Sequence, residues 1–284
     1  MGAGNMGGMF ARRWMEMKVF GPEHIIVTGR NEGKLKPLAD AGLRRMGNAE
    51  AAQEAGIILL AVKPKDIAAV AEEIAPYCKG KLVISIAAGT PVSVLNAKLE
   101  GARVVRAMPN IACSVGEGVV ALYARGAGKR IRQELDRLFG SMGKLHWVGE
   151  RAIELLTGIS GSGPAYVFNL IAELETLLLK AGLNAGAARS IAAQTFLGAA
   201  KVMQERADSP VETLTGEVAC PNGTTEKGLI KARQLGLFEL FGSVVDEGSK
   251  KALQMSREAK QKFRLEKGAR QERILAAPRE LKGL

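Results

Sequence analysis

The sequence is poor in histidine, cysteine and aromatic residues, and it contains no long apolar run. Cys78, Cys113 and Cys220 are odd in number, widely separated and outside any C-x-x-C spacing, which excludes a disulfide framework and a zinc site. The longest aliphatic run, Ile57–Val62, is far too short to cross a bilayer. No secretory signal pattern opens the chain. We therefore expect a cytoplasmic protein with reduced thiols, no metal site and no membrane partner.

The remaining composition is that of a globular protein, with 47% apolar and 24% charged residues. The net charge of +11 lies mostly at the C-terminal end, where residues 250–284 hold eleven Lys or Arg and four Asp or Glu, a net of +7. This basic tail lacks the interleaved aromatic residues that bind single-stranded nucleic acid. We interpret it as a solvated helix face and expect no nucleic-acid partner.

The first half of the chain alternates short β-rich runs with helical stretches, which predicts a parallel α/β sheet. The expected strands are Ile25–Thr28, Ile57–Val62, Leu82–Ile86, Val104–Ala107 and Val119–Leu122. The expected helices lie near Leu35–Ala41, Ala68–Ala75, Val92–Leu99 and Arg130–Met142. Residues 1–150 are thus predicted to form a Rossmann-like, doubly wound dinucleotide-binding domain.

Strand signals stop after Glu150, and residues 165–181, 187–206, 225–235 and 237–266 carry helical periodicity. Residues 151–284 are therefore predicted to form an all-helical domain with the basic tail at its end. In helix 165–181 the apolar residues cover more than one face, so the helix requires burial on two sides. Either it is a central core helix, or part of it forms the interface of a homodimer or larger homo-oligomer.

A nucleotide-binding signal stands at the start of the chain. Gly2, Gly4, Asn5, Met6 and Gly7 belong to a G-x-G-x-x-G pattern that opens a helix. Such glycines allow a tight turn and let the backbone approach a pyrophosphate, which the free N–H groups of the helix then bind. The β run at Ile25–Thr28 follows at the spacing where a ribose-binding residue is expected.

The residues after that run favour NADPH over NADH. Thr28 is followed by Gly29 and Arg30, and no acid closes the strand. An acid there would bind ribose hydroxyls and repel a 2′-phosphate, whereas Arg attracts the phosphate. Lys34 is placed to assist one turn later. The alternative is that Arg30 is a solvated loop residue and Glu32 binds the ribose, although Glu32 fits the first turn of the next helix better.

A dinucleotide fingerprint normally follows a central strand, yet here only Met1 precedes Gly2. The first strand of the Rossmann-like domain is therefore expected to be missing from this sequence. Its absence would leave the two neighbouring strands without backbone partners on one side. We expect an upstream strand of about 5–8 apolar residues to restore the domain.

Four further segments, with the fingerprint, resemble the pyrroline-5-carboxylate reductase family in the right order over nearly the whole chain. Ala61-Val62-Lys63-Pro64 is similar to its A-V-K-P turn, and Val105–Asn110 to its V-R-x-M-P-N segment. Ser160–Tyr166 reads S-G-S-G-P-A-Y, like the start of the family's helical domain. Val218–Thr225 is similar to its substrate loop.

The resemblance implies NADPH-dependent reduction of 1-pyrroline-5-carboxylate to L-proline, the last step of proline biosynthesis. It implies that the substrate carboxylate is bound by the loop residues Cys220, Gly223, Thr224 and Thr225, with Thr225 facing the ring nitrogen as the catalytic residue. It also places the Ala61–Pro64 turn and Asn110 at the cofactor. Without the other segments, Gly223–Thr225 would be a plain helix cap after a Pro-Asn-Gly turn.

The chain also departs from the family pattern. The family usually has hydroxyl residues at Ala219 and Cys220, Gly at Asn222, and Thr-Pro at Ile111-Ala112. Two alternatives therefore stay open: an NADP-binding paralogue without turnover, and another NADP-linked oxidoreductase of the same two-domain plan. The latter enzymes commonly use a Lys or His of the helical half, but this half has no His, and Lys180 and Lys201 lie outside any substrate-loop signature.

Overall fold

The computed structural model describes residues 1–276, and the end of the basic tail, 277–284, lies outside the described residues. The chain divides into two compact units. The first contains Met1–Gly161 together with the chain from Gly248 onward, and the second is Ser162–Glu247. This division falls eleven residues after the expected boundary at 150/151, and it assigns most of the last helix to the first unit.

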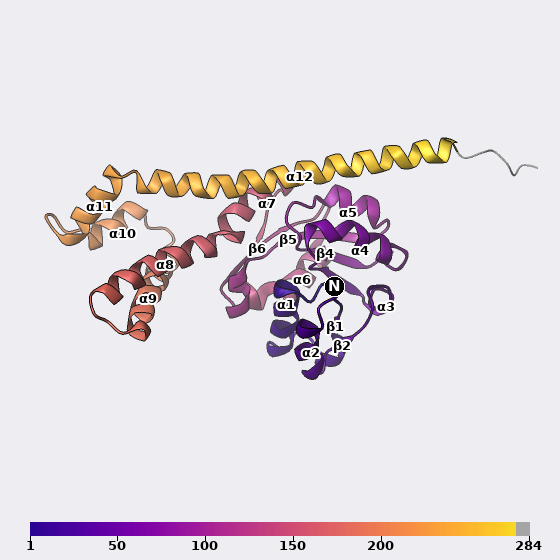
Figure 1. Cartoon of the computed structure of the whole chain (residues 1–284), viewed down its shortest axis with the longest axis horizontal. Coiled ribbons are helices and arrows are strands. Elements are labelled where there is room, and N and C mark those ends of the chain that lie inside the picture. Colours follow the sequence, from indigo (N-terminus) through magenta and orange to yellow (C-terminus); the bar gives the residue numbers. More distant parts are fainter. Residues whose placement is uncertain (277–284) are drawn as a thin grey trace, which may run out of the picture. The chain divides into compact units, whose positions relative to one another are not determined.

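The first unit contains two sheets rather than one (Figure 1). A two-stranded parallel sheet pairs β1 (Ile26–Val27) with β2 (Arg44–Arg45). A five-stranded sheet has the order β3-β4-β5-β6-β7, and only its β5–β6 pair is antiparallel. Its strands are β3 (Ile57–Leu60), β4 (Leu82–Ser85), β5 (Arg103–Met108), β6 (Gly118–Tyr123) and β7 (Gly143–Trp147).

Helices cover both faces of the larger sheet, as a doubly wound domain requires. Successive strand residues point to opposite faces, so Leu59 packs in one apolar core while Ile58 and Leu60 pack in the other. The helices are α1 (Asn5–Glu16), α2 (Glu32–Asp40), α3 (Asn48–Glu54), α4 (Ile67–Ile74), α5 (Val92–Lys98), α6 (Lys129–Phe139) and α7 (Glu150–Leu156). The predicted Rossmann-like fold is confirmed.

The chain then continues through a π-helical turn, Thr157–Gly161, into the helices of the second unit. These are α8 (Gly163–Lys180), α9 (Ala185–Glu205), α10 (Val211–Val218), α11 (Thr224–Gln234) and the beginning of α12 (Leu237–Ala276). Helices α8 and α9 run side by side, tied by an ion pair between Arg189 and Glu175 at 3.1 Å. The all-helical character of this part is as predicted.

Helix α8 has no buried residue in the single chain, even though its sequence is strongly apolar. Phe168 is 59% exposed and Leu177 is 60% exposed. The chain by itself thus leaves unburied the apolar surface that the sequence marks for burial.

Within the first unit, the later part of α12 packs against the loop after β4. Gly89 has φ +65°, and a Cβ added there would lie 2.6 Å from the Cβ of Met255. Only glycine fits both the backbone conformation and the space.

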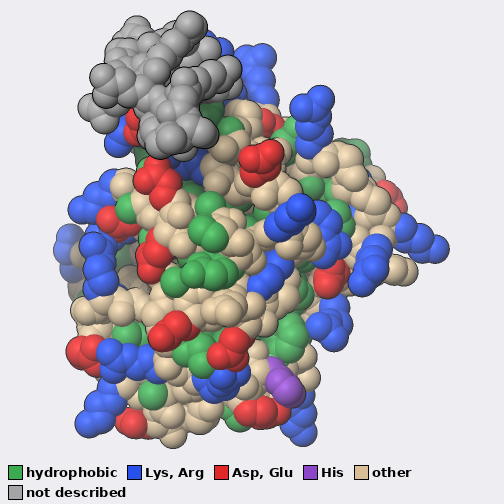
Figure 2. All heavy atoms as spheres, turned by 90° about the vertical axis from the view of Figure 1, so that its right-hand side faces the viewer, with side chains coloured by type: hydrophobic (Ala, Val, Ile, Leu, Met, Phe, Trp, Pro, Cys, Tyr) green, Lys and Arg blue, Asp and Glu red, His purple; other side chains and the backbone are tan. Residues whose placement is uncertain are grey.

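Figure 2 shows Lys and Arg side chains interspersed with Asp and Glu on one face of the molecule.

The sequence patterns missed five of the described strands and helices. Strands β2 and β7 were not predicted, because Arg44–Arg45 is polar and Gly143–Trp147 alternates weakly between apolar and charged residues. Helices α3, α7 and α10 are only 7, 7 and 8 residues long, too short to show clear periodicity.

Candidate cofactor and substrate sites

The fingerprint loop packs tightly against the turn that follows β3. Gly2 has φ +85°, and a Cβ there would lie 2.7 Å from Val62 Cγ1 and 2.9 Å from the carbonyl carbon of Ala61. A Cβ at Gly7 would lie 2.3 Å from the Gly2 carbonyl oxygen. Both positions therefore require glycine, and the Ala61–Val62 backbone forms one wall of the loop.

The loop ends in a helix terminus with free donors. Gly4 is the N-cap of α1 and supplies no side-chain cap, and the first turn contains no acid. The N–H groups of Asn5, Met6 and Gly7 therefore have no intrahelical acceptor. Such a terminus suits a pyrophosphate, because the amides point outward and the helix dipole favours negative charge.

Two cations lie on the fingerprint side of β1. Arg30 is 87% exposed, and its Nη2 is 3.0 Å from Asp66 Oδ2. Lys34 donates from Nζ to Asn5 Oδ1 at 2.7 Å, which links α2 to the fingerprint. Asn31 caps α2 by accepting from the Lys34 backbone N–H at 3.2 Å. The cap fixes the turn that carries both cations.

Glu32 begins α2, as the sequence predicted, and its carboxylate is already engaged. Arg45 Nη1 donates to Glu32 Oε2 at 2.6 Å, and Arg45 Nη2 contacts Oε1. This pairing directs the Glu32 carboxylate to β2. Sequence reasoning missed Asp66 beside Arg30, because the two residues are 36 positions apart and no local pattern connects them.

The Ala61–Pro64 turn leaves Lys63 exposed, and Pro64 starts a 3-10 turn that leads into α4.

Asn110 is 8% exposed, and its side-chain amide is hydrogen-bonded within the protein. Its Nδ2 donates to the Ser160 carbonyl at 3.0 Å, and its Oδ1 accepts from the Val119 N–H at 3.3 Å. The side chain thus joins the end of β5 to β6 and to the π-helical turn.

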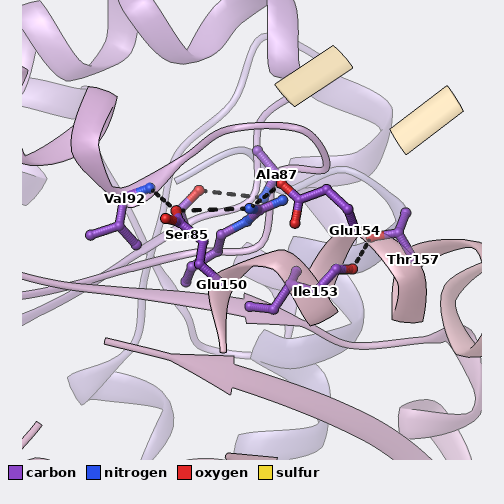
Figure 3. Close-up of polar contacts among 8 residues, drawn as sticks. Ser85, Ala87, Val92, Glu150, Ile153, Glu154 and Thr157 are labelled. Carbon is purple, nitrogen blue, oxygen red and sulfur yellow. Dashed lines mark hydrogen bonds and ion pairs between the residues drawn. The ribbon is translucent and has the colours of Figure 1, made fainter. Parts of the chain in front are cut away.

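A buried ion pair lies beneath this region, and the sequence analysis did not anticipate it (Figure 3). Arg106 on β5 is 1% exposed, and its Nη1 lies 2.8 Å from Glu154 Oε1 and 4.0 Å from Glu150 Oε1 on α7. Glu150 Oε1 also accepts from the Val92 N–H at 2.6 Å. The visible signal was Arg106 in the predicted strand Val104–Ala107, whose other residues are apolar.

The predicted substrate loop connects α10 to α11. Gly223 is the N-cap of α11 and offers no side-chain cap, so the amides of Thr224 and Thr225 lack intrahelical acceptors. The Gly223 N–H donates to the Cys220 carbonyl at 2.9 Å, and the Asn222 N–H donates to Glu226 Oε2 at 2.7 Å. Thr225 is half-buried, whereas Thr224 and Cys220 are exposed.

One departure from the family pattern is compatible with the loop geometry. Asn222 adopts φ +60°, in the left-handed region. Asparagine tolerates this region better than other residues that carry a Cβ, so it can stand where the family has glycine.

The described residues contain no group of three or more His, Cys, Asp or Glu side chains that could hold a metal ion. No described helix is long and apolar enough to span a membrane.

Two family profiles match the chain. Residues 150–255 match the family described as pyrroline-5-carboxylate reductase dimerisation, and residues 1–89 match the family described as NADP oxidoreductase, coenzyme F420-dependent. The pyrroline-5-carboxylate reductase of Methanosarcina acetivorans is 35% identical over 263 residues, which cover 90% of this chain and 97% of the relative.

Solved structures give the same result. The pyrroline carboxylate reductase of Plasmodium falciparum with NADP bound has a TM-score of 0.82 and 28% identity, covering 90% of this chain and 96% of the other. The pyrroline-5-carboxylate reductase of Coxiella burnetii has a TM-score of 0.80 and 32% identity, with the same coverage. These likenesses span both units and confirm the resemblance inferred from the motifs. The chain belongs to the pyrroline-5-carboxylate reductase family.

Proposed function

We propose that this chain reduces 1-pyrroline-5-carboxylate to L-proline with NADPH. The observation that carries the proposal is the match to named reductases over almost their full length, including both the nucleotide-binding unit and the helical unit. The Plasmodium relative binds NADP, which supports the same cofactor for this chain.

The residues of the first unit fit that cofactor. The free amides of Asn5, Met6 and Gly7 in the first turn of α1 suit the pyrophosphate. Arg30 is our candidate for the 2′-phosphate, with Lys34 in support, and the Arg30 side chain must exchange Asp66 for the phosphate. We assign the Ala61–Pro64 turn to the nicotinamide side of the nucleotide. We propose that Asn110 contributes to the cofactor site by holding the end of β5 against β6 and the π-helical turn.

The loop of the second unit fits the substrate carboxylate. The free amides of Thr224 and Thr225 are donors at a helix terminus, and the two hydroxyls add further donors. Cys220 is exposed on the same loop but is a weak donor where the family has a hydroxyl. The Glu226 carboxylate in the first turn of α11 reduces the positive potential there. We therefore expect the loop to bind the substrate carboxylate less tightly than it would with a hydroxyl residue at position 220.

The reaction adds one hydride to the imine carbon and one proton to the ring nitrogen, which balances the conversion of C=N to a secondary amine. NADPH supplies the hydride when bound. The chain's own groups position the substrate, and we assign to the Thr225 hydroxyl a hydrogen bond to the ring nitrogen. Neither histidine lies on the substrate loop, so the scheme requires no imidazole.

We also propose that the protein is a homo-oligomer that assembles through its helical unit. The matched dimerisation family covers this unit, and α8 leaves Phe168 and Leu177 largely exposed in the single chain. Apolar surface of this kind on a folded unit indicates an association face. The three free cysteines support the further proposal of a cytoplasmic location.

The test is an assay of the purified chain with NADPH and racemic 1-pyrroline-5-carboxylate, following NADPH consumption and L-proline formation together. We expect one L-proline per NADPH consumed. NADPH binding without proline would favour the paralogue without turnover. Turnover of a 2-hydroxy or 3-hydroxy acid instead would favour another oxidoreductase of the same plan.

A further inference from the structure

The turn that follows β4, residues Ala87–Pro91, lies where the nicotinamide half of a dinucleotide would run. Ligands of open α/β sheets bind outside the carboxyl ends of the strands. The fingerprint loop lies between β1 and β3, so a nucleotide with its 2′-phosphate at Arg30 extends past β3 toward β4. The Ile86 N–H donates to the Leu60 carbonyl at 3.1 Å, which places the start of the turn directly beside the Ala61–Pro64 turn.

This turn is buried, and its first end is held by a long hydrogen bond. Ala87 and Thr90 are each only 4% exposed. The Ala87 N–H donates to Ser85 Oγ at 3.4 Å (Figure 3). Hydrogen bonds of this length are weak. The position of the turn therefore depends on its packing against α12 at Gly89 and on the bond at its other end.

At that other end, a carboxylate distant in the chain caps α5. Pro91 is the N-cap residue and supplies no side-chain acceptor. Val92 is the first helical residue and is 3% exposed, so its N–H has no intrahelical acceptor and needs another partner. Glu150 Oε1 on α7 accepts from this N–H at 2.6 Å, across a separation of 58 positions (Figure 3). Hydrogen bonds from an N–H to a carboxylate are about twice as strong as neutral ones.

The Glu150 carboxylate is itself held in place. It belongs to the first residue of α7, and Arg106 Nη1 lies 4.0 Å from Oε1 and offsets part of its charge. Arg106 is fixed in turn by Glu154, one turn later on the same helix, at 2.8 Å. Helix α7 is anchored through Ile153, which is fully buried. Glu150 thus ties the turn after β4 to a helix whose position is set by β5 and by the core.

On the basis of the cofactor proposed above, we propose that Glu150 is a positioning residue for the nicotinamide half of NADPH. Its bond from the Val92 N–H fixes the end of the Ala87–Pro91 turn, and the backbone of that turn supports the nicotinamide half. Glu150 acts through the turn. Loss of its carboxylate should loosen the nicotinamide half, whereas the adenosine half, bound by the fingerprint loop and Arg30, should stay in place.

The test titrates the full chain with two ligands that differ in the nicotinamide half. NADPH is followed by its own fluorescence, and adenosine 2′,5′-bisphosphate, which carries the 2′-phosphate but no nicotinamide, is followed by calorimetry. Glu150→Ala removes the acceptor, and Glu150→Gln keeps an oxygen at the same position. The control is Leu135→Ala on α6, which removes a fully buried side chain from the apolar core that contains α1 and Leu59.

We expect Glu150→Ala to weaken NADPH binding about fivefold or more, with a smaller change in NADPH fluorescence and parental affinity for the bisphosphate. Glu150→Gln should bind both ligands like the parent. Leu135→Ala should melt at a lower temperature and keep both affinities, which separates positioning from general stability.

Parental NADPH affinity in Glu150→Ala would overturn the proposal. Equal weakening of both ligands, a glutamine variant no better than the alanine variant, or an equal loss of NADPH affinity in Leu135→Ala would do the same. A parent chain that bound neither ligand would overturn the cofactor assignment together with this role of Glu150. All of these readouts are independent of proline formation.

Discussion

The buried pair of Arg106 and Glu154 gives the sharpest stability prediction. Glu154→Leu would leave the guanidinium of Arg106, 1% exposed, with the Glu150 carboxylate at 4.0 Å as its remaining partner. Removing one partner of a buried ion pair costs about 3–5 kcal/mol. Because Glu150 still offsets part of the charge, we expect a loss of about 3 kcal/mol in the free energy of unfolding.

The double substitution Arg106→Met with Glu154→Leu should recover most of that loss. It removes both buried charges, and in the described structure Arg106 Nη2 and Glu154 Oε2 already lack hydrogen-bond partners. Glu150 keeps its hydrogen bond from the Val92 N–H and is less deeply buried than Glu154, so its carboxylate tolerates the loss of Arg106. The double variant should therefore unfold within about 1–2 kcal/mol of the parent.

Urea denaturation followed by circular dichroism gives the free energy of unfolding of the parent, of Glu154→Leu and of the double variant. Arg106→Met alone completes the double-mutant cycle. The matched control is Glu217→Gln, which breaks the exposed pair with Arg206 and should leave the urea midpoint nearly unchanged. If Glu154→Leu cost no more than this control, or if the double variant were no more stable than the single one, the assignment of the pair as a buried, mutually dependent unit would be wrong.

Four further predictions concern the two sites and the amino terminus. Arg30→Ala should raise the KM for NADPH about tenfold or more and leave that for NADH nearly unchanged, and equal effects would refute the 2′-phosphate assignment. Thr225→Val should lower kcat/KM about ten- to hundredfold with NADPH binding intact, and Cys220→Ser should lower the substrate KM; unchanged kinetics would return the loop to a capping role. Gly7→Ala, whose Cβ would meet the Gly2 carbonyl oxygen at 2.3 Å, should weaken NADPH binding at least tenfold in a titration, and parental affinity would contradict the packed loop. Because burial lowers the pKa of the Met1 amino group from 8.0 to about 6, the unfolded chain binds more protons between these values, so the free energy of unfolding should rise by about 2 kcal/mol from pH 6 to pH 8; amino-terminal acetylation should flatten that rise, and the same rise after acetylation would exclude Met1 as its source.

The sequence by itself determined the features that depend on neighbours along the chain. Glycine spacing defined the fingerprint loop, because only glycine permits φ +85° at Gly2 and the close approach at Gly7. Continuous apolar runs predicted the buried strands, and helical periodicity predicted α8, α9 and α11.

Tertiary structure alone decided what depends on residues distant in the chain. Asp66 lies beside Arg30, and Glu154 beside Arg106, across separations of 36 and 48 positions that no local pattern records. Strand β7 forms because β6 offers it a parallel partner, although its own residues are only half-buried.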